Sequence, residues 1–202
     1  MPGTILAYLE GRAASLLTAE RTMLNLLQTL SAIATRTADF VDLVAGTGAR
    51  ICDTRKTLPG LRLASKYAVA VGGGCNQRIG LSDGVLIKEN HIRACGDIRA
   101  ALAAVYCNAA NVPVQVEVTS LEELQEALQA GAKRILLDNF SPPLLQEAVQ
   151  QAGPDIELEA SGGIGPDTVS AVAVTGVQRI SVGSLTKDIR AVDLSLQFFP
   201  WS

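Results

Sequence analysis

Charged and polar residues recur directly after short apolar runs of this sequence, and their types suit the binding of an anionic ligand. Basic residues follow the early runs, whereas carboxylates, hydroxyls and glycines follow the later ones. The positions are Asp53, Thr54, Arg55, Lys56, Lys88, Glu89, Asn90, His91, Glu117, Asp138, Asn139, Ser161, Gly162, Gly163, Gly183 and Ser184. In parallel α/β proteins, ligands bind beyond the carboxyl ends of the strands. We therefore expect a ligand with several negative charges at one end and a metal-bound phosphorylated group at the other.

The glycine turns and the two later carboxylates each have a structural explanation beside the functional one. Residues 161–163 precede Pro166 at an expected helix start, so their N–H groups could bind a phosphate or simply form a tight turn. The same choice holds for residues 183–184. Glu117 and Asp138 lie in apolar surroundings, where an unpaired carboxylate is costly. Each therefore either forms a structural ion pair or helps to hold a hydrated Mg²⁺.

Other chemistry-bearing residues support fewer functions. The glycine run 72–74 predicts a flexible loop and lacks the GxGxxG spacing of a dinucleotide site. His91 is the only histidine, and no Ser/His/Asp or Cys/His arrangement follows from the spacing, so we interpret it as a hydrogen-bonded structural residue. The four cysteines form no CxxC pair, which disfavours a zinc site and predicts reduced thiols in a cytoplasm.

The elements that must position these residues follow from hydrophobic spacing. Helical spacing over residues 16–44 predicts one long helix or two abutting ones, and apolar runs then alternate with amphipathic stretches in the rhythm of a parallel sheet. Strands are expected at 85–87, 114–118, 135–137, 156–160 and 180–182, with helices at 97–107, 121–130, 142–151 and 166–174. Runs 51–53 and 69–71 bring the count to six or seven strands, fewer than the eight of a closed barrel. The expected fold class is α/β, an open or incomplete α/β barrel of mostly parallel strands with outer helices.

Composition limits the classes of function. The chain has 202 residues, of which 48% are apolar and 18% charged, with a net charge of −3; these values predict a globular domain and disfavour disorder and nucleic-acid binding. No apolar run reaches the ~18 residues of a membrane span, and the N-terminus does not resemble a signal peptide. Residues 4–9 could form a strand, but without a neighbouring partner. We expect the domain to occupy 16–202, with 1–15 as a remnant of a preceding domain.

Charge is distributed unevenly. Residues 50–93 contain eight Lys and Arg against three Asp and Glu, while the rest of the chain is strongly acidic. A basic segment within an acidic protein indicates a small anionic ligand rather than a polyanion, although a solvated loop surface would show the same balance.

Several motifs together resemble the quinolinate phosphoribosyltransferase family. The matching segments are residues 20–25, 53–62, 66–69, 72–74, 81–83, 88–91, 137–140, 159–164 and 181–186. The resemblance covers nearly the whole chain from Leu16 to Leu194. It implies that quinolinate and phosphoribosyl pyrophosphate, with Mg²⁺, are converted to nicotinate mononucleotide, pyrophosphate and carbon dioxide in NAD synthesis. It also implies a homodimer or higher homo-oligomer in the cytoplasm.

The resemblance also implies residue roles. Arg55, Lys56, Arg78 and Lys88 would contact the quinolinate carboxylates, and Arg21 would reach the partner's site across a dimer interface. Glu117 and Asp138 would hold Mg²⁺ and the ribose hydroxyls, while residues 161–163 and 183–184 would bind the 5′-phosphate. The predicted catalytic residues are Lys56, Lys88, Glu117 and Asp138; the predicted substrate-binding residues are Arg21, Thr54, Arg55, Lys56, Gln77, Arg78, Lys88, Ser161, Gly162, Gly163, Gly183 and Ser184.

Two departures from the family pattern leave alternatives open. Gln77 stands where the family has a histidine, so the side chain can donate a hydrogen bond but carries no charge. The N-terminal α/β domain of the family is largely missing from this sequence. A non-catalytic barrel that binds anions or phosphoribosyl ligands, or assembles with intact subunits, therefore remains an alternative. A molybdenum-associated relative, and an unrelated barrel aldolase or isomerase with Lys88 as a Schiff-base lysine, are two others.

Overall fold

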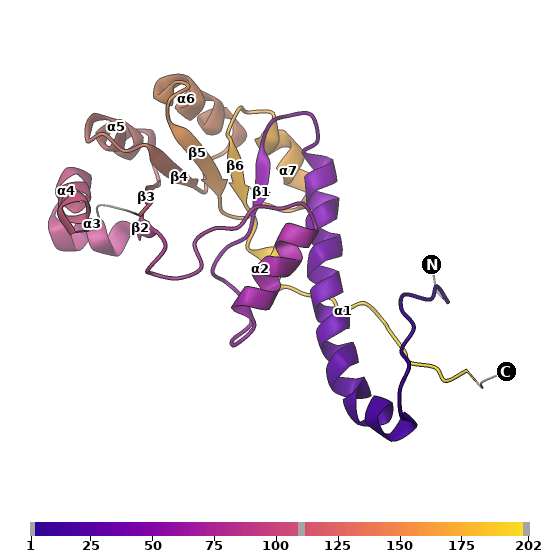
Figure 1. Ribbon diagram of the computed structural model, residues 1–202. Coiled ribbons are helices and arrows are strands. Elements are labelled where there is room, and N and C mark those ends of the chain that lie inside the picture. Colours follow the sequence, from indigo (N-terminus) through magenta and orange to yellow (C-terminus); the bar gives the residue numbers. More distant parts are fainter. Residues whose placement is uncertain (1–2, 109–111, 200–202) are drawn as a thin grey trace.

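The fold is built on a parallel sheet whose strands alternate with helices. The computed structural model describes residues 3–108 and 112–199, and within them six strands are joined in the order β1-β6-β5-β4-β3-β2 (Figure 1). The strands are β1 Arg50–Cys52, β2 Val85–Ile87, β3 Val114–Val118, β4 Arg134–Asp138, β5 Glu157–Ser161 and β6 Arg179–Ser181. Every pairing is parallel, and no pairing between β1 and β2 occurs among the described residues. The sheet is therefore an open barrel, as the sequence predicted.

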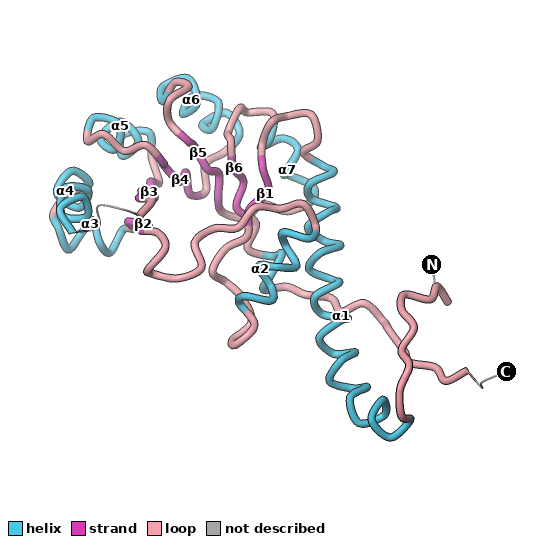
Figure 2. The backbone as a smooth tube through the Cα atoms, in the orientation of Figure 1, coloured by secondary structure: helices cyan, strands magenta, loops and turns pink. Residues whose placement is uncertain are grey.

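The helices cover the outside of the sheet (Figure 2). They are α1 Ala13–Leu43, α2 Arg62–Val71, α3 Glu89–Cys95, α4 Ile98–Asn108, α5 Leu121–Gln129, α6 Pro142–Ala152, α7 Pro166–Ala173 and α8 Ser184–Lys187. Helix α4 packs on β2, α5 on β3, α7 on β6 and α1 on β1. Connections of this kind require about one helix between neighbouring parallel strands, which is the rhythm seen in the sequence.

The long N-terminal helix is continuous. The sequence predicted either one long helix or two abutting helices, and the 31 residues of α1 form one helix. Its buried positions include Leu24, Ile33 and Phe40. The C-terminal segment runs back beside α1, where the Val192 N–H donates to the Gln28 carbonyl at 3.1 Å. No described helix has both the length and the apolar character needed to cross a membrane.

Strand alternation sends apolar residues to the helices and polar residues to the barrel interior. Ile135 and Leu137 of β4 are buried, as are Leu158 of β5 and Ile180 of β6. Because successive side chains in a strand point to opposite faces, the positions between them face inward. These inward positions are Gln115, Glu117, Arg134, Leu136, Asp138, Glu157, Glu159, Ser161, Arg179 and Ser181. The barrel is therefore polar inside, and the apolar core lies between sheet and helices.

The segment 75–78 lies in the gap between β1 and β2. The backbones of Cys75 and Cys52 pair in an isolated parallel β-bridge, and both thiols are free. The Asp53 N–H donates to the Cys75 carbonyl at 3.0 Å, and the Cys75 N–H donates to the Ile51 carbonyl at 2.7 Å. These bonds partly satisfy the free edge of β1, which would otherwise leave backbone groups unpaired.

Two segments that the sequence offered as possible strands form none. Residues 69–71, expected as a possible strand, belong to α2, whose buried positions Ser65, Lys66, Ala68 and Val69 follow helical spacing. A three-residue apolar run cannot distinguish a strand from one turn of a buried helix. The glycine run 72–74 follows α2 directly, where a Cβ on Gly72 would lie 2.7 Å from Thr37 Cβ and one on Gly74 2.7 Å from Thr37 Cγ2. Glycine is needed there because the chain passes directly against α1. Residues 4–9 form no strand.

Candidate functional site

The carboxyl ends of the strands bring cations and carboxylates together. Lys88 follows β2 and Glu117 lies in β3, and Lys88 Nζ is 2.6 Å from Glu117 Oε2. The Lys88 side chain is 49% exposed and that of Glu117 18%, so this pair lies at an open mouth rather than in the core. The structure thus gives Glu117 a cation partner, which was one of the two explanations left open by the sequence.

Asp138 ends β4, and the residue after it has an unusual backbone. Asn139 has a φ of 59°, and its Nδ2 donates to Asp138 Oδ2 at 2.8 Å. Its own N–H donates to the Ser161 carbonyl at 2.8 Å, which ties the end of β4 to the end of β5. Gly162 has a φ of 98°, and a Cβ there would lie 2.8 Å from the Asn139 nitrogen. Gly162 therefore provides both the backbone freedom and the space that Asn139 needs to orient Asp138.

Two glycine turns at the neighbouring strand ends expose N–H groups. Gly162 and Gly163 both have positive φ values, of 98° and 62°, just after β5. Within the described part of the chain, the N–H groups of Gly162, Gly163, Gly183 and Ser184 have no hydrogen-bond acceptor. Unpaired N–H groups in such turns are suited to bind an anion.

The loop after β1 lies beside the second of these turns. The Lys56 N–H donates to Thr54 Oγ1 at 3.1 Å, and Thr186 Oγ1 of α8 donates to the Lys56 carbonyl at 2.9 Å. A Cβ on Gly183 would lie 3.5 Å from Lys56 Cδ. Ser184 Oγ accepts a bond of 3.3 Å from Arg36 Nη2 of α1. Thr54, Lys56, Gly183 and Ser184 thus form one corner of the mouth.

Arg55 and Arg78 form a strongly cationic part of the site. Arg55 Nε is buried and has no hydrogen-bond partner among the described residues. Burial lowers the pKa of Arg78, and the like charge of Arg55 lowers that pKa further. Arg78 Nη1 donates to the Gly84 carbonyl at 2.9 Å, immediately before β2. A buried guanidinium donor without a partner, close to a second guanidinium, indicates a place for a carboxylate or another anion.

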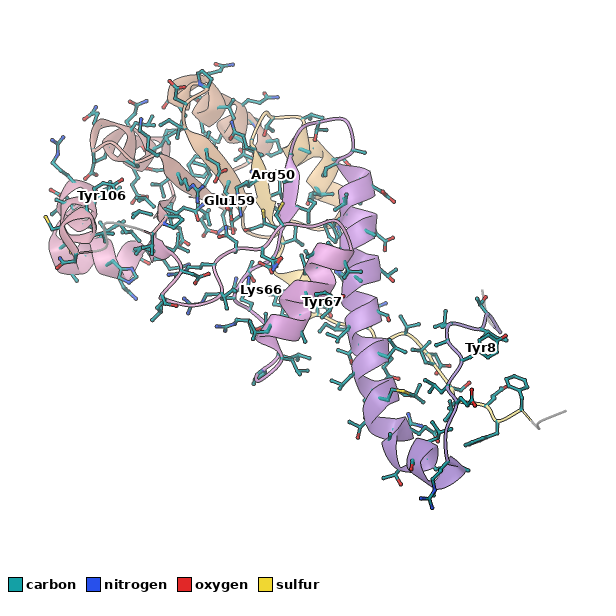
Figure 3. The ribbon with its side chains drawn as sticks, viewed as in Figure 1. Tyr8, Arg50, Lys66, Tyr67, Tyr106 and Glu159 are labelled. Atoms are coloured by element: carbon teal, nitrogen blue, oxygen red, sulfur yellow. The ribbon has the colours of Figure 1, made fainter. Side chains whose placement is uncertain are left out.

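The loops that carry these arginines are held by residues that the sequence did not single out. Arg62 of α2 donates to the Arg55 carbonyl at 3.2 Å and to the Ile79 carbonyl at 3.1 Å. Lys66 belongs to α2 and is labelled in Figure 3. Its Nζ lies 2.7 Å from Asp53 Oδ1 and 2.7 Å from the Gln77 carbonyl. Burial raises the pKa of Asp53, and the bonds from Lys66 and from the Gln77 N–H oppose that rise. Arg62 and Lys66 lie within the matched motifs of the sequence, but their contacts form only when the chain is folded.

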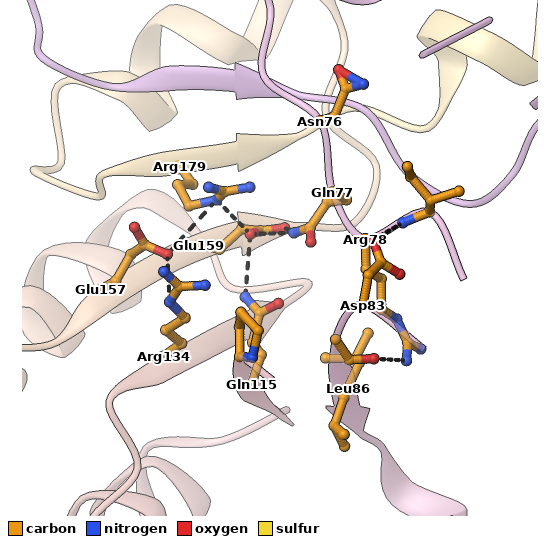
Figure 4. Close-up of a pocket in the computed structure, with 14 residues that line it drawn as sticks. Asn76, Gln77, Arg78, Asp83, Leu86, Gln115, Arg134, Glu157, Glu159 and Arg179 are labelled. Carbon is orange, nitrogen blue, oxygen red and sulfur yellow. Dashed lines mark hydrogen bonds and ion pairs between the residues drawn. The ribbon is translucent and has the colours of Figure 1, made fainter. Parts of the chain in front are cut away.

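Gln77 points into the barrel interior rather than only toward the mouth. Its Nε2 donates to both carboxylate oxygens of Glu159, which also accepts from Arg179 Nε at 3.0 Å, Gln115 Nε2 at 3.2 Å and Ser181 Oγ (Figure 4). This network borders a cavity of about 300 Å³ near the amino ends of the strands, and Arg78 lines that cavity together with Arg134 and Glu157. Sequence reasoning missed Glu159, because a carboxylate inside an apolar run has no local signal for its partners.

Arg21 and His91 take different places. Arg21 lies on α1 with its side chain 69% exposed, and its one ion pair within the described residues is with Glu20 at 4.0 Å. The structure therefore does not join Arg21 to the strand-end residues of its own chain. His91 Nδ1 accepts the Lys88 N–H at 3.0 Å, so it is hydrogen-bonded at the start of α3, as expected of a structural residue.

Comparisons with known proteins agree on one family. The family model for the quinolinate phosphoribosyl transferase C-terminal domain matches residues 33–197. The chain is 49% identical over 197 residues to the nicotinate-nucleotide pyrophosphorylase (carboxylating) of Mycobacterium leprae, an alignment that covers 96% of this chain and 69% of that protein. A probable nicotinate-nucleotide pyrophosphorylase (carboxylating) of Bacillus subtilis is 45% identical over 195 residues, covering 96% and 68%.

A solved structure gives the same result for the fold. The nicotinate-nucleotide pyrophosphorylase of Francisella tularensis superposes with a TM-score of 0.89 at 51% identity, covering 92% of this chain and 66% of that one. The chain spans about two thirds of the length of these relatives. The family model, the sequence identities and the superposition agree, and the chain belongs to the quinolinate phosphoribosyl transferase family.

Proposed function

We propose that this chain transfers a phosphoribosyl group from phosphoribosyl pyrophosphate to quinolinate with loss of carbon dioxide, giving nicotinate mononucleotide and pyrophosphate. The observation that carries the proposal is the buried, unpartnered Nε of Arg55 in the loop after β1, which Arg62 bonds to the segment that carries Arg78. Relatives named quinolinate phosphoribosyltransferase (decarboxylating) are 42% identical to the chain. Guanidinium groups can each donate two parallel hydrogen bonds to a carboxylate, so two arginines suit a planar dicarboxylate.

The acceptor half of the reaction would use Arg55, Arg78, Lys88 and Lys56. The arginines would bind and orient the two carboxylates, so that the pyridine nitrogen faces the ribose carbon. Lys88 would leave Glu117 to contact a carboxylate, because its ammonium is exposed enough to move. Positioning and charge neutralisation of this kind supply much of the rate in transfers between two bound substrates.

The donor half would use the glycine turns and the two carboxylates. The free N–H groups of Gly162, Gly163 and Ser184 would bind the 5′-phosphate, with Ser161 and Thr54 beside them. Glu117 Oε1 and Asp138 Oδ1 accept no hydrogen bond from the described residues and remain available for the ribose hydroxyls and a cation.

The donor set fits Mg²⁺. Magnesium is bound in proteins through one or two carboxylates together with substrate phosphates and water. No cluster of three or more His, Cys, Asp or Glu side chains suitable for a metal occurs in the described residues, so Glu117 and Asp138 alone would hold the ion beside the substrate. When bound, Mg²⁺ would neutralise charge on the pyrophosphate.

The bond changes are balanced within the two substrates. The ribose carbon loses its bond to pyrophosphate through an oxocarbenium-like transition state and gains a bond to the pyridine nitrogen. The adjacent carboxylate then leaves as carbon dioxide, its bonding electrons stay on the ring carbon, and a proton from solvent takes its place. This chain's residues hold the charges at both ends while the bonds change.

The proposal also includes assembly and compartment. We propose a homodimer in the cytoplasm in which Arg21 completes the partner's site. Support comes from the exposure of Arg21 and of Leu17, Leu26 and Leu27 on the same helix. Sedimentation of the purified protein tests the dimer: a monomer at all concentrations would contradict this part. Mixing Arg21→Ala with Lys88→Met chains would restore about a quarter of the sites if Arg21 acts across the interface.

Two measurements test the activity. Calorimetric titration with phosphoribosyl pyrophosphate and Mg²⁺, repeated with quinolinate present, should show saturable binding of both substrates. Quinolinate-dependent release of pyrophosphate should follow, and it should disappear when Asp138 is replaced by Asn. Binding without release would support the non-catalytic alternative, and no binding by folded protein would contradict the proposal.

A further inference from the structure

Helix α2 presents two basic side chains to the loops that carry the anion-binding arginines. Arg62 and Lys66 are one helical turn apart, so they lie on the same side of the helix. Arg62 donates to the carbonyl of Arg55, and Lys66 donates to the carbonyl of Gln77, the residue before Arg78. Each loop is therefore bonded to α2 at, or next to, its arginine.

The contact made by Lys66 is the more deeply buried of the two. The Lys66 side chain is 2% exposed and that of Asp53 is fully buried. Lys66 Nζ, Asp53 Oδ1 and the backbone of Gln77 form a closed set of three contacts, each 2.7 Å long. Loss of one partner of a buried ion pair strongly destabilises the folded protein, because the other charge is left buried without a partner. This pair therefore holds the backbone of Gln77 in a fixed position.

Segment 75–78 has a reason to move if that contact is lost. It is not part of any strand, and it lies in the gap between β1 and β2. It also carries Arg78 beside the loop of Arg55, because Arg62 donates to the carbonyls of both Arg55 and Ile79. The like charge of Arg55 lowers the pKa of Arg78, and the bonds from α2 and Asp53 hold the two loops together against this repulsion.

We propose that Lys66 is a positioning residue of the dicarboxylate site, holding the backbone of Gln77 against the end of β1 so that Arg78 and Arg55 converge on one anion. Lys66 itself does not touch the ligand. The inference rests on the proposed function, because it takes quinolinate as that anion.

The first test compares the affinities for the two substrates. In Lys66→Met the Kd for quinolinate should rise at least tenfold, while the Kd for phosphoribosyl pyrophosphate with Mg²⁺ changes less than twofold. The double variant Asp53→Asn with Lys66→Met leaves no unpaired buried charge, so it should fold and show the same split. Lys133→Met, which removes an exposed lysine, is the matched control and should change neither Kd. Equal weakening of both substrates would indicate a merely structural role and overturn the proposal.

The second test does not depend on the substrate. Amide hydrogen exchange should be faster at Gln77, whose N–H donates to Asp53 Oδ1, in both Lys66 variants, with no change in β3 to β5. Unchanged exchange at this amide would overturn the proposal even if binding were weaker. If the parent protein binds no quinolinate, the proposed function fails, and the exchange result alone decides whether Lys66 holds segment 75–78.

Discussion

Gln77 donates its side-chain amide to both oxygens of the buried Glu159 carboxylate, and its own backbone is held by Asp53 and Lys66. This residue therefore links the Glu159 network in the barrel interior to the segment that carries Arg78. Glu159 receives donors from four side chains but only one full positive charge, from Arg179. The Glu159 carboxylate could therefore also accept a hydrogen bond from a positively charged side chain at position 77.

Gln77→His should strengthen quinolinate binding. An imidazole placed against the Glu159 carboxylate is expected to have a raised pKa and to remain protonated, which adds a cation next to Arg78. The KM for quinolinate should fall several-fold, while the KM for phosphoribosyl pyrophosphate stays the same. Turnover assays of parent and variant measure this effect. Gln77→Leu, which removes the hydrogen-bond donor without adding charge, should instead lower the free energy of unfolding by about 1–3 kcal/mol. Equal kinetics of parent and Gln77→His would show that charge here is irrelevant.

Lys88→Met should move metal and quinolinate affinities in opposite directions. Lys88 occupies one oxygen of Glu117 at 2.6 Å, so its removal frees the carboxylate for a cation. In the absence of substrates, Mn²⁺ used as a spectroscopic substitute for Mg²⁺ should bind a few-fold more tightly. Quinolinate should bind at least tenfold more weakly, because a carboxylate partner is lost. Lys56→Met is the control and should leave Mn²⁺ affinity unchanged. If Mn²⁺ binds Lys88→Met and the parent equally, Glu117 is not a metal ligand.

The sheet could be predicted because its strands bury one apolar face against helices. Runs 85–87 and 114–118 matched β2 and β3 from end to end, and the other runs that became strands differ from the observed strands by one residue at each end. The run at 69–71 failed because three apolar residues fit either structure; of the three, only Val69 is buried in α2, against Ile33 of α1, while Val71 is exposed. Helices α2, α3 and α8 have short amphipathic patterns that local spacing does not separate from loops.

The strand-end rule brought Lys88, Glu117 and Asp138 to one mouth, whereas their roles remain predictions. What could not be predicted was the support beneath them. Lys66 meets Asp53 across 13 residues and Gln77 meets Glu159 across 82, and both contacts exist only once the barrel has formed. Gly72 and Gly74 show the same limit, because their need for glycine arises from the distant helix α1.

Gly162→Ala should be more damaging than Gly163→Ala, although both residues have positive φ. An alanine at either site is strained by about 1–2 kcal/mol. At Gly162 the new Cβ would also lie 2.8 Å from the Asn139 nitrogen, whereas at Gly163 it would meet nothing within 4 Å. We expect losses of about 3 and about 1 kcal/mol, respectively, in urea unfolding. Equal losses would mean that Asn139 can shift freely, and its hydrogen bond to Asp138 would then not be a fixed part of the site.

Cys52 should make folding stability fall at alkaline pH. Burial raises the pKa of this thiol to about 12. In the unfolded chain this thiol has a pKa of about 8.5, so the unfolded state loses the proton at a pH where the folded state still keeps it. The stability that this raised pKa contributes is fully present below about pH 8.5 and is lost as the pH rises toward 12. Between pH 7 and 10 the loss through Cys52 should be about 1–2 kcal/mol.

Urea unfolding at several pH values measures the slope for parent and Cys52→Ala. The variant loses packing and is less stable at pH 7, but its stability should fall less steeply from pH 8.5 to 10. Cys95→Ala, which removes an exposed thiol, should keep the slope of the parent. Native protein at pH 8 should also react with thiol reagents at Cys95 and Cys107 while Cys52 reacts only after unfolding. A slope unchanged by Cys52→Ala would mean that this thiol ionises in the barrel as readily as in the unfolded chain.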